Sequence, residues 1–182
     1  MRRRLRRLAA VGILVLGSVV AGPGTAHADL HCSKTWHYIT HGETGATARP
    51  DGEPPYWVHA NGNRSADYWN QQVLFCYGDG WGTDHYAIYS NRTKKWWGSD
   101  GQGAVHASNP SLTEYAVFEI RRYDPTWWSI RYVGNAQEEH PFKREYVAPR
   151  WDDDHYYGWL FSTTEPLNGN ALWSFSPNNL MG

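Results

Sequence analysis

The chain has 182 residues, with 17 Lys and Arg against 18 Asp and Glu, and it contains 11 Trp, 12 Tyr and 5 Phe. Five arginines, an apolar run from Leu8 to Val20 and the sequence Ala26-His27-Ala28 together form the pattern of a secretory signal peptide. We therefore predict that residues 1–28 are a signal peptide and that the protein is secreted. The apolar run is shorter than the roughly 20 residues that a spanning helix needs, so we expect no membrane segment.

The part of the chain after residue 28 has a composition that excludes one large class of proteins. It has 154 residues and, with five arginines removed, a formal net charge of −6. Nucleic-acid-binding proteins neutralise phosphates with clustered Lys and Arg, so we expect no nucleic-acid partner. All 28 aromatic residues lie in this part, far more than a core of this size requires. Either the surface presents rings or the core is built from them.

Cys32 and Cys76 are the only cysteines in the chain. An even number of cysteines in an exported protein predicts a disulfide, although two unpaired buried thiols are the alternative. The bond would close a loop of 45 residues and stabilise the fold by about 2–4 kcal/mol in the chain-entropy model.

Helical periodicity is nearly absent after residue 28, and short runs rich in Tyr, Trp, Val and Ile dominate instead. Clusters of Gly, Asn, Asp and Pro separate these runs, as in Arg49-Pro50-Asp51-Gly52 and Gly78-Asp79-Gly80. This is the pattern of an all-β protein with many short strands. No Pro/Ser-rich linker divides the chain, so we predict one domain over residues 29–182.

A threefold internal repeat organises these runs. Each unit opens with a run centred on an isoleucine, in chain order Tyr38-Ile39-Thr40, Ala87-Ile88-Tyr89 and Ser129-Ile130-Arg131. A second matching run follows in Trp57-Val58-His59-Ala60-Asn61, Ala104-Val105-His106-Ala107-Ser108 and Trp159-Leu160-Phe161-Ser162-Thr163. The third matching run is Leu74-Phe75-Cys76-Tyr77, Val117-Phe118-Glu119-Ile120 and Leu172-Trp173-Ser174-Phe175. Its alternation suits a strand with one buried face.

The spacing within the units is nearly constant. Thirteen positions separate Val105 from Phe118 and Leu160 from Trp173, whereas the first unit has 17 because of an insertion in the polar Asn61 to Gln71 segment. Three units of four short strands predict a β-trefoil, in which six strands close a barrel and three hairpins cap one end. The isoleucines together with Phe75, Phe118 and Trp173 would line that barrel.

The middle unit, from His85 to Ile120, resembles fascin-like members of the β-trefoil group, and the repeat as a whole resembles the ricin-B-like trefoils. The likeness rests on Tyr86-Ala87-Ile88-Tyr89-Ser90, Lys95-Trp96-Trp97-Gly98-Ser99-Asp100, Ala104-Val105-His106-Ala107-Ser108 and Tyr115-Ala116-Val117-Phe118-Glu119-Ile120. The Gln-x-Trp motif of ricin-type sugar-binding trefoils is missing from all three units. The resemblance implies a trefoil but not that family's galactose site.

Paired aromatic residues suggest where a ligand would bind. Adjacent strand residues point to opposite faces, so one ring of a pair such as Trp96-Trp97 must face away from the core. Exposed Trp and Tyr rings stack on sugars, and the trefoil resemblance implies sites on the hairpin of each unit. We therefore predict that the protein binds an extracellular polysaccharide or glycan as a monomer. The expected ligand-binding residues are Trp57 in the first unit, Trp97 and Asp100 in the second, and Tyr146, Asp153 and Tyr157 in the third.

Metal and cofactor motifs are weak or missing. No cluster of Cys and His has zinc spacing, and His59 with His106 occupy equivalent repeat positions, which indicates a structural role. The run 152–154 of three Asp residues lacks the pattern of a calcium loop. We expect no metal and no cofactor.

Two other functions stay open. Gln137-Glu138-Glu139, followed by Glu145-Tyr146-Val147-Ala148-Pro149-Arg150, is similar to the active-site end of secreted mono-ADP-ribosyltransferase toxins, which would make Glu139 catalytic. β-Trefoils also include secreted protease inhibitors, and the Asn61 to Gln71 and Gly134 to Arg144 stretches are the candidate loops. We favour the function without catalysis.

Overall fold

The computed structural model describes residues 29–63, 68–100, 102–112, 116–133, 145–151, 158–163 and 169–181. The predicted signal peptide lies outside these ranges and stays a prediction. The described strands and 3-10 helices follow in this order: β1 Leu30–Cys32, β2 His37–His41, β3 Thr47–Pro50, β4 Val58–Gly62, η1 Tyr68–Gln71, β5 Gln72–Gly78, β6 His85–Ser90, β7 Trp96–Ser99, β8 Val105–Asn109, β9 Val117–Arg122, β10 Trp128–Tyr132, β11 Glu145–Pro149, β12 Leu160–Thr163, η3 Gly169–Ala171 and β13 Leu172–Ser176.

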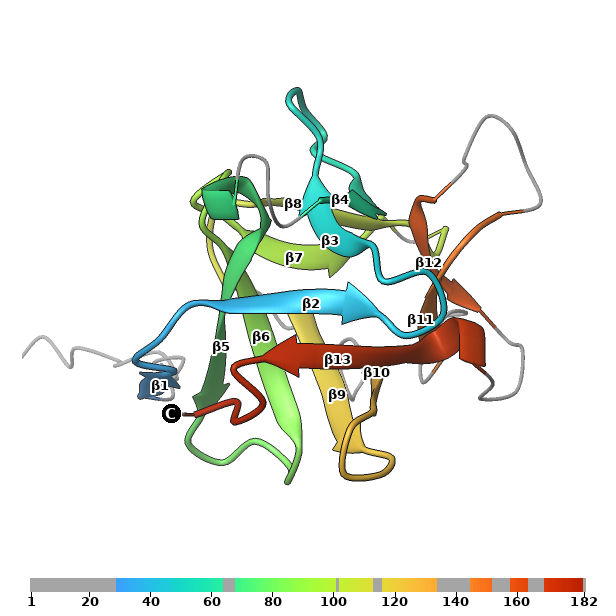
Figure 1. Ribbon diagram of the computed structural model, residues 1–182. Helices are drawn as coiled ribbons and strands as arrows, with labels where there is room; N and C mark the ends of the chain where they lie inside the picture. The colour runs from blue at the N-terminus through green and yellow to red at the C-terminus, as the bar shows by residue number, and fades with distance from the viewer. Residues whose placement is uncertain are drawn as a thin grey trace, which may run out of the picture.

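Twelve of these strands form the three predicted four-stranded units, β2–β5, β6–β9 and β10–β13 (Figure 1). The first and last strands of each unit pair with each other and with the neighbouring units, so β2, β5, β6, β9, β10 and β13 close into a ring of antiparallel pairs. The middle strands form the hairpins β3–β4, β7–β8 and β11–β12. The chain has the predicted β-trefoil fold, in which closure leaves the barrel without an open edge.

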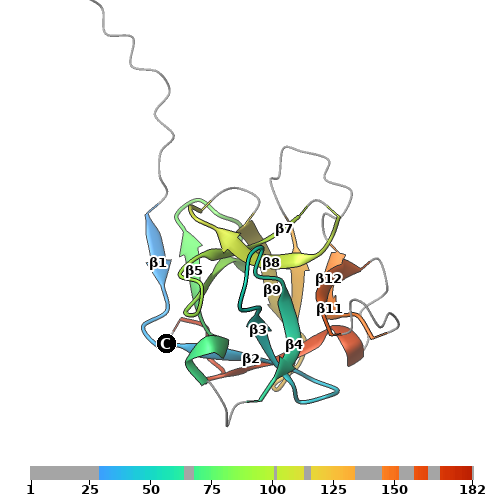
Figure 2. The same cartoon turned by 90° about the horizontal axis from the view of Figure 1, so that it is seen from above.

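The three hairpins gather at one end of the barrel (Figures 1 and 2). We call this end the cap, and the opposite end the barrel mouth. The turn between β9 and β10 and the C-terminal end of the chain lie at the mouth in Figure 1.

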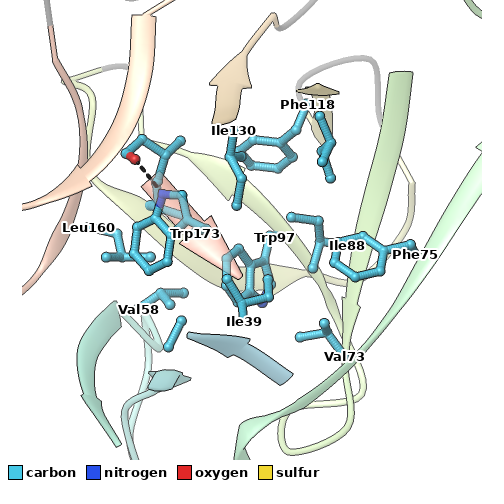
Figure 3. Packing of buried hydrophobic residues seen from close by; sticks show 14 of the residues in the cluster. Ile39, Val58, Val73, Phe75, Ile88, Trp97, Phe118, Ile130, Leu160 and Trp173 are labelled. Atoms are coloured by element: carbon cyan, nitrogen blue, oxygen red, sulfur yellow. Dashed lines mark hydrogen bonds between the residues drawn. The ribbon is translucent and has the colours of Figure 1, made fainter. Parts of the chain in front are cut away.

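The barrel lining agrees with the repeat. Ile39, Ile88 and Ile130 are fully buried, and so are the equivalent aromatic residues Phe75, Phe118 and Trp173. The buried residues come from every unit and form one cluster (Figure 3). Alternation along each strand explains this arrangement, because every second side chain points into the barrel.

Trp97 breaks the symmetry of the core. The paired hairpin positions place it level with Ala48 and Val147 of the other two units. Trp97 is only 1% exposed and lies in the middle of the labelled side chains in Figure 3. One large ring therefore fills space that two small residues leave, as close packing of a protein interior requires.

The disulfide prediction is confirmed by a bond between Cys32 and Cys76, which face each other in register across β1 and β5. Strand β1 was not predicted from the repeat. It lies outside the three units and pairs with β5 alone among the described strands. The bond therefore attaches the start of the described chain to the barrel.

Two buried histidines join distant parts of the chain. His37 Nδ1 lies 3.0 Å from the carbonyl oxygen of Pro177, and His41 Nε2 lies 3.0 Å from that of Asn170. A carbonyl only accepts, so each of these nitrogens is a donor. Burial lowers the pKa of both histidines, although these backbone hydrogen bonds oppose the shift.

We predict that the core depends far more on Trp97 than on its neighbour Trp96, which is half-buried against Tyr89. Trp97→Ala should lower the free energy of unfolding by about 3–5 kcal/mol, because it removes a buried ring and leaves a cavity. Trp96→Ala is the matched control and should cost clearly less. Urea denaturation of both variants measures the difference. Equal losses would contradict the placement of Trp97 at the centre of the core.

We also predict that the fold loses stability on mild acidification. The unfolded chain binds protons at the ordinary histidine pKa of about 6.5, whereas folded His37 and His41 resist protonation, so stability falls as the pH drops through that value. The slope is at most about 1.4 kcal/mol per pH unit for each histidine. Urea denaturation between about pH 7.5 and pH 5.5 should show the slope, and His41→Gln should reduce it. A flat profile in both proteins would overturn the prediction.

Candidate functional site

Three backbone hydrogen bonds join the hairpins at the centre of the cap. The amides of Ala60, Ala107 and Ser162 donate to carbonyls of a neighbouring unit, at 2.7–2.9 Å. The accepting residues are the equivalent Gly158, Tyr56 and Gly103, and all three have a positive φ, of 78°, 58° and 98°. The same left-handed backbone is thus needed in each unit, although only two units supply the glycine that adopts it without strain.

The residues between these acceptors and donors face alternately inward and outward. Val58, Val105 and Leu160 are buried in the core, so the residues beside them point to the outer surface of the cap. Isolated bridges pair these outward positions between units, joining Trp57 to His106, Ala104 to Phe161 and Trp159 to His59. The fold therefore brings side chains that are far apart in the sequence to one place.

Aromatic rings fill most of these outward positions. We call the residues Trp57, His59, His106, Trp159 and Phe161 the cap cluster. The indoles of Trp57 and Trp159 stack with ring centroids 5.3 Å apart. The His59 ring meets Trp159 edge to face at 5.0 Å, and the His106 ring meets Trp57 in the same way at 6.0 Å. Both indoles are half-buried, so part of each stays open to solvent.

Polar groups surround the cap cluster. His59 Nε2 lies 2.9 Å from a carboxylate oxygen of Asp51, whose side chain is 42% exposed. Arg49 Nε donates to Asn61 Oδ1 at 2.8 Å, and these two residues flank His59 on the same hairpin. The Arg150 guanidinium lies over the Phe161 ring, 5.3 Å from its centroid. The cap thus combines apolar rings with nearby hydrogen-bond donors and acceptors.

The second histidine of the cluster is held neutral. Burial lowers the pKa of His106, and a hydrogen bond with the Ser99 backbone and the negative charge of Asp100 oppose this shift. Its Nδ1 lies 2.6 Å from the hydroxyl oxygen of Ser108. A neutral imidazole beside Trp57 adds a flat polar ring without adding charge to the cap.

The structure places the predicted ligand-binding residues in different surroundings. Trp57 lies in the cap cluster. Trp97 is in the core, which corrects the expectation that its ring faces a ligand: the residue of the pair that faces outward is Trp96. Asp100 is exposed, but its Oδ1 accepts hydrogen bonds from two backbone amides of its own turn.

The third-unit residues are only partly described. Tyr146 is half-buried on β11 under the guanidinium of Arg131, 5.1 Å from the ring centroid. Asp153 and Tyr157 lie outside the described residues, and so does Glu139 of the toxin hypothesis, so these predictions stay untested.

Four members of the cap cluster were missed as ligand-binding candidates: His59, His106, Trp159 and Phe161. Trp159 stands at the repeat position of Trp57, and His106 at the position of His59, so the alignment of the units already contained the signal. The alignment does not show which residues of different units are in contact, because those contacts exist only in the closed cap.

The described residues show no group of three or more His, Cys, Asp or Glu that could hold a metal ion. Within the same residues, no helix has the length and apolar character to cross a membrane.

The closed barrel, its three hairpins and their threefold cap define a β-trefoil protein. No protein-family model and no curated protein matches the chain. Among solved structures it is similar to ThreeFoil, a designed threefold-symmetric protein, with a TM-score of 0.60, 10% identity, and 77% of this chain and 96% of that chain covered.

Two further solved structures have the same fold. A lectin of Polyporus squamosus, bound to the human-type influenza-binding epitope Neu5Acα2-6Galβ1-4GlcNAc, matches with a TM-score of 0.60 and 12% identity over 79% of this chain and 49% of that chain. The BEL β-trefoil matches with a TM-score of 0.57 and 17% identity over 79% of this chain and 92% of that chain. At these identities the likeness establishes the fold.

We predict a reversal of the usual preference for alanine over glycine at position 56. Tyr56→Gly and Tyr56→Ala both remove the ring and its contact with the Lys95 ammonium, but only glycine relieves the left-handed backbone. The glycine variant should be more stable than the alanine variant by about 1 kcal/mol. At Tyr77, in strand β5, alanine should be the more stable replacement. Thermal and urea unfolding of the four variants measure these stabilities. The prediction is refuted if the alanine variant is the more stable one at both positions.

Proposed function

We propose that this protein is a secreted, non-catalytic β-trefoil that binds an extracellular polysaccharide or glycan as a monomer. The observation that supports the proposal most directly is the cap cluster, in which Trp57 and Trp159 from different units form one half-exposed aromatic patch. Sugar rings have apolar C–H faces that pack on such indoles, and their hydroxyls need hydrogen-bond partners nearby.

The surrounding groups suit a sugar better than an ion. The Asp51 carboxylate and the Asn61 amide can exchange hydrogen bonds with hydroxyl groups. The neutral His106 ring adds no charge to the cap. Asp51 and Arg150 provide opposite charges near the cluster, so the cap presents no strong field of one sign. The glycan bound to the Polyporus squamosus lectin offers independent support for carbohydrate as the ligand class, since that protein shares the fold.

A panel of insoluble polysaccharides and immobilised glycans, incubated with protein that starts at residue 29, tests the proposal. We expect retention on at least one of them. Trp57→Ala and Trp159→Ala should each weaken that retention about tenfold or more, a loss of roughly 1.4 kcal/mol. Trp69→Ala is the matched control, because Trp69 is 49% exposed on η1 and does not belong to the cap cluster.

Circular dichroism and thermal unfolding should accompany each variant, so that a loss of binding is not confused with a loss of fold. No retention of the wild-type protein on any surface would refute carbohydrate binding. Retention that survives both cap substitutions but not Trp69→Ala would move the site away from the cap.

A further inference from the structure

A groove of about 550 Å³ lies at the barrel mouth, between strands β6, β9 and β10 and the C-terminal segment. Its lining includes Asp84, Tyr86, Arg121, Trp128, Asn178 and Met181. The volume falls within the range of about 300–1,000 Å³ that is usual for small-molecule sites.

The threefold repeat explains why the groove is open on one side of the mouth. His37, Tyr86 and Trp128 each stand two residues before the buried isoleucine of their unit, so all three point inward at the mouth. The C-terminal segment covers His37, whose Nδ1 hydrogen-bonds with Pro177, and it buries Leu180 in the core. Tyr86 and Trp128 are only half-buried, and they form the walls of the groove.

The wall residues are held in place by contacts around the groove. Trp128 Nε1 donates to Asn178 Oδ1 at 2.7 Å, and Asn178 Nδ2 donates to the carbonyl of Pro125 at 3.2 Å. These bonds fix the C-terminal segment against the β9–β10 turn. On the other wall, the Tyr86 ring packs edge to face with Phe75 of the core, with ring centroids 6.4 Å apart.

A buried carboxylate orients the arginine at the rim. Glu119 is 9% exposed in its side chain, and its two oxygens bind Arg121 at 2.8 Å and Arg131 at 3.1 Å. Arg121 is 57% exposed and also approaches Asp84, with 3.7 Å between Nε and Oδ2. Arg121 lines the groove, and much of its side chain faces solvent.

Tyr86 and Asp84 supply hydrogen-bonding groups of complementary kind. Tyr86 packs against the core but is only half-buried, so it is partly open to the groove. Burial raises its pKa, and the charge of Asp84 adds to the shift, so the hydroxyl stays protonated. Asp84 is 42% exposed and has a φ of 64°, a conformation that Asp and Asn tolerate better than most residues.

The charges select the class of ligand. Asp84 disfavours an anion, whereas Arg121 and Arg122, which both line the groove, disfavour a cation. Arg121 is already paired with Glu119, and Arg122 donates to the carbonyls of Asp124 and Pro125. A carboxylate, a phenol and a guanidinium together suit neighbouring hydroxyl groups, because each hydroxyl both donates and accepts. We propose that this groove is a second binding site for a neutral sugar, so that one chain binds carbohydrate at both ends of its barrel. The ligand class rests on the proposed function, but the residues and the position are separate from the cap.

Isothermal titration of the protein from residue 29 onward with neutral oligosaccharides of glucose, galactose and N-acetylglucosamine tests this second site. Wild-type protein should bind two equivalents. Asp84→Asn with Tyr86→Phe should bind one, because the first change keeps a residue that tolerates the backbone of position 84 and the second removes only a hydroxyl. Tyr89→Phe, on the same strand but the opposite face, is the control and should bind two.

The outcomes separate the two sites. Two equivalents in the Asp84→Asn, Tyr86→Phe protein would overturn the groove site, and so would complete loss of binding on replacing Trp57 and Trp159 by Ala. If that cap variant instead binds like the wild type while the groove variant binds nothing, the groove site stands and the cap proposal fails. No binding by the wild-type protein would overturn both.

Discussion

Closure of the backbone into rings is the constraint on which the rest of the structure depends. Six strands close the barrel, and three amide-to-carbonyl bonds close the cap. The second ring is demanding, because its acceptors at Tyr56, Gly103 and Gly158 must all adopt a left-handed backbone. Since the residues after them face outward, closing the cap also assembles the aromatic cluster. The contact between Trp57 and Trp159 is thus a direct consequence of how the main chain closes.

The side chains depart from the symmetry that the backbone keeps. At one level of the core a single Trp97 stands where the other units have Ala48 and Val147. At the barrel mouth the equivalent residues are His37, Tyr86 and Trp128, and only the first is fully buried. These departures matter for function, because three identical units would leave neither an uneven groove nor an asymmetric cap. The backbone is threefold symmetric, whereas both candidate sites lie where the side chains of the three units differ.

Much of the fold could be predicted from the sequence because the same pattern of apolar residues occurs in all three units. The buried isoleucines Ile39, Ile88 and Ile130 recur at matching places, and alternation around them defines an inward face. The twelve strands of the units, including those of the divergent first unit, form as the pattern indicates. Strand β1 could not be predicted in the same way, since it belongs to no repeat and is attached by its disulfide and its pairing with β5.

The candidate site was less accessible to sequence reasoning. In Trp96-Trp97 one ring must face the core, but the pair itself does not say which, and the choice of Trp97 as the ligand-facing ring was wrong. The register of β7 with β8 decides which of the two rings faces the core, and a single sequence does not show how strands pair. Trp57 was identified because it is part of the repeat. Its partners were missed because the cap joins residues of different units, about a hundred positions apart for Trp57 and Trp159.

The location of the chain ends has a consequence for how the molecule meets its surroundings. Strand β1 and the end of the described C-terminal segment lie near each other on the same side of the barrel in Figure 1, away from the cap hairpins. Protein that starts at residue 29, if immobilised through either of these segments, would hold its cap hairpins away from the support. Attachment chemistry alone could then expose one end of the barrel to large polymers while leaving the other reachable only by small soluble sugars.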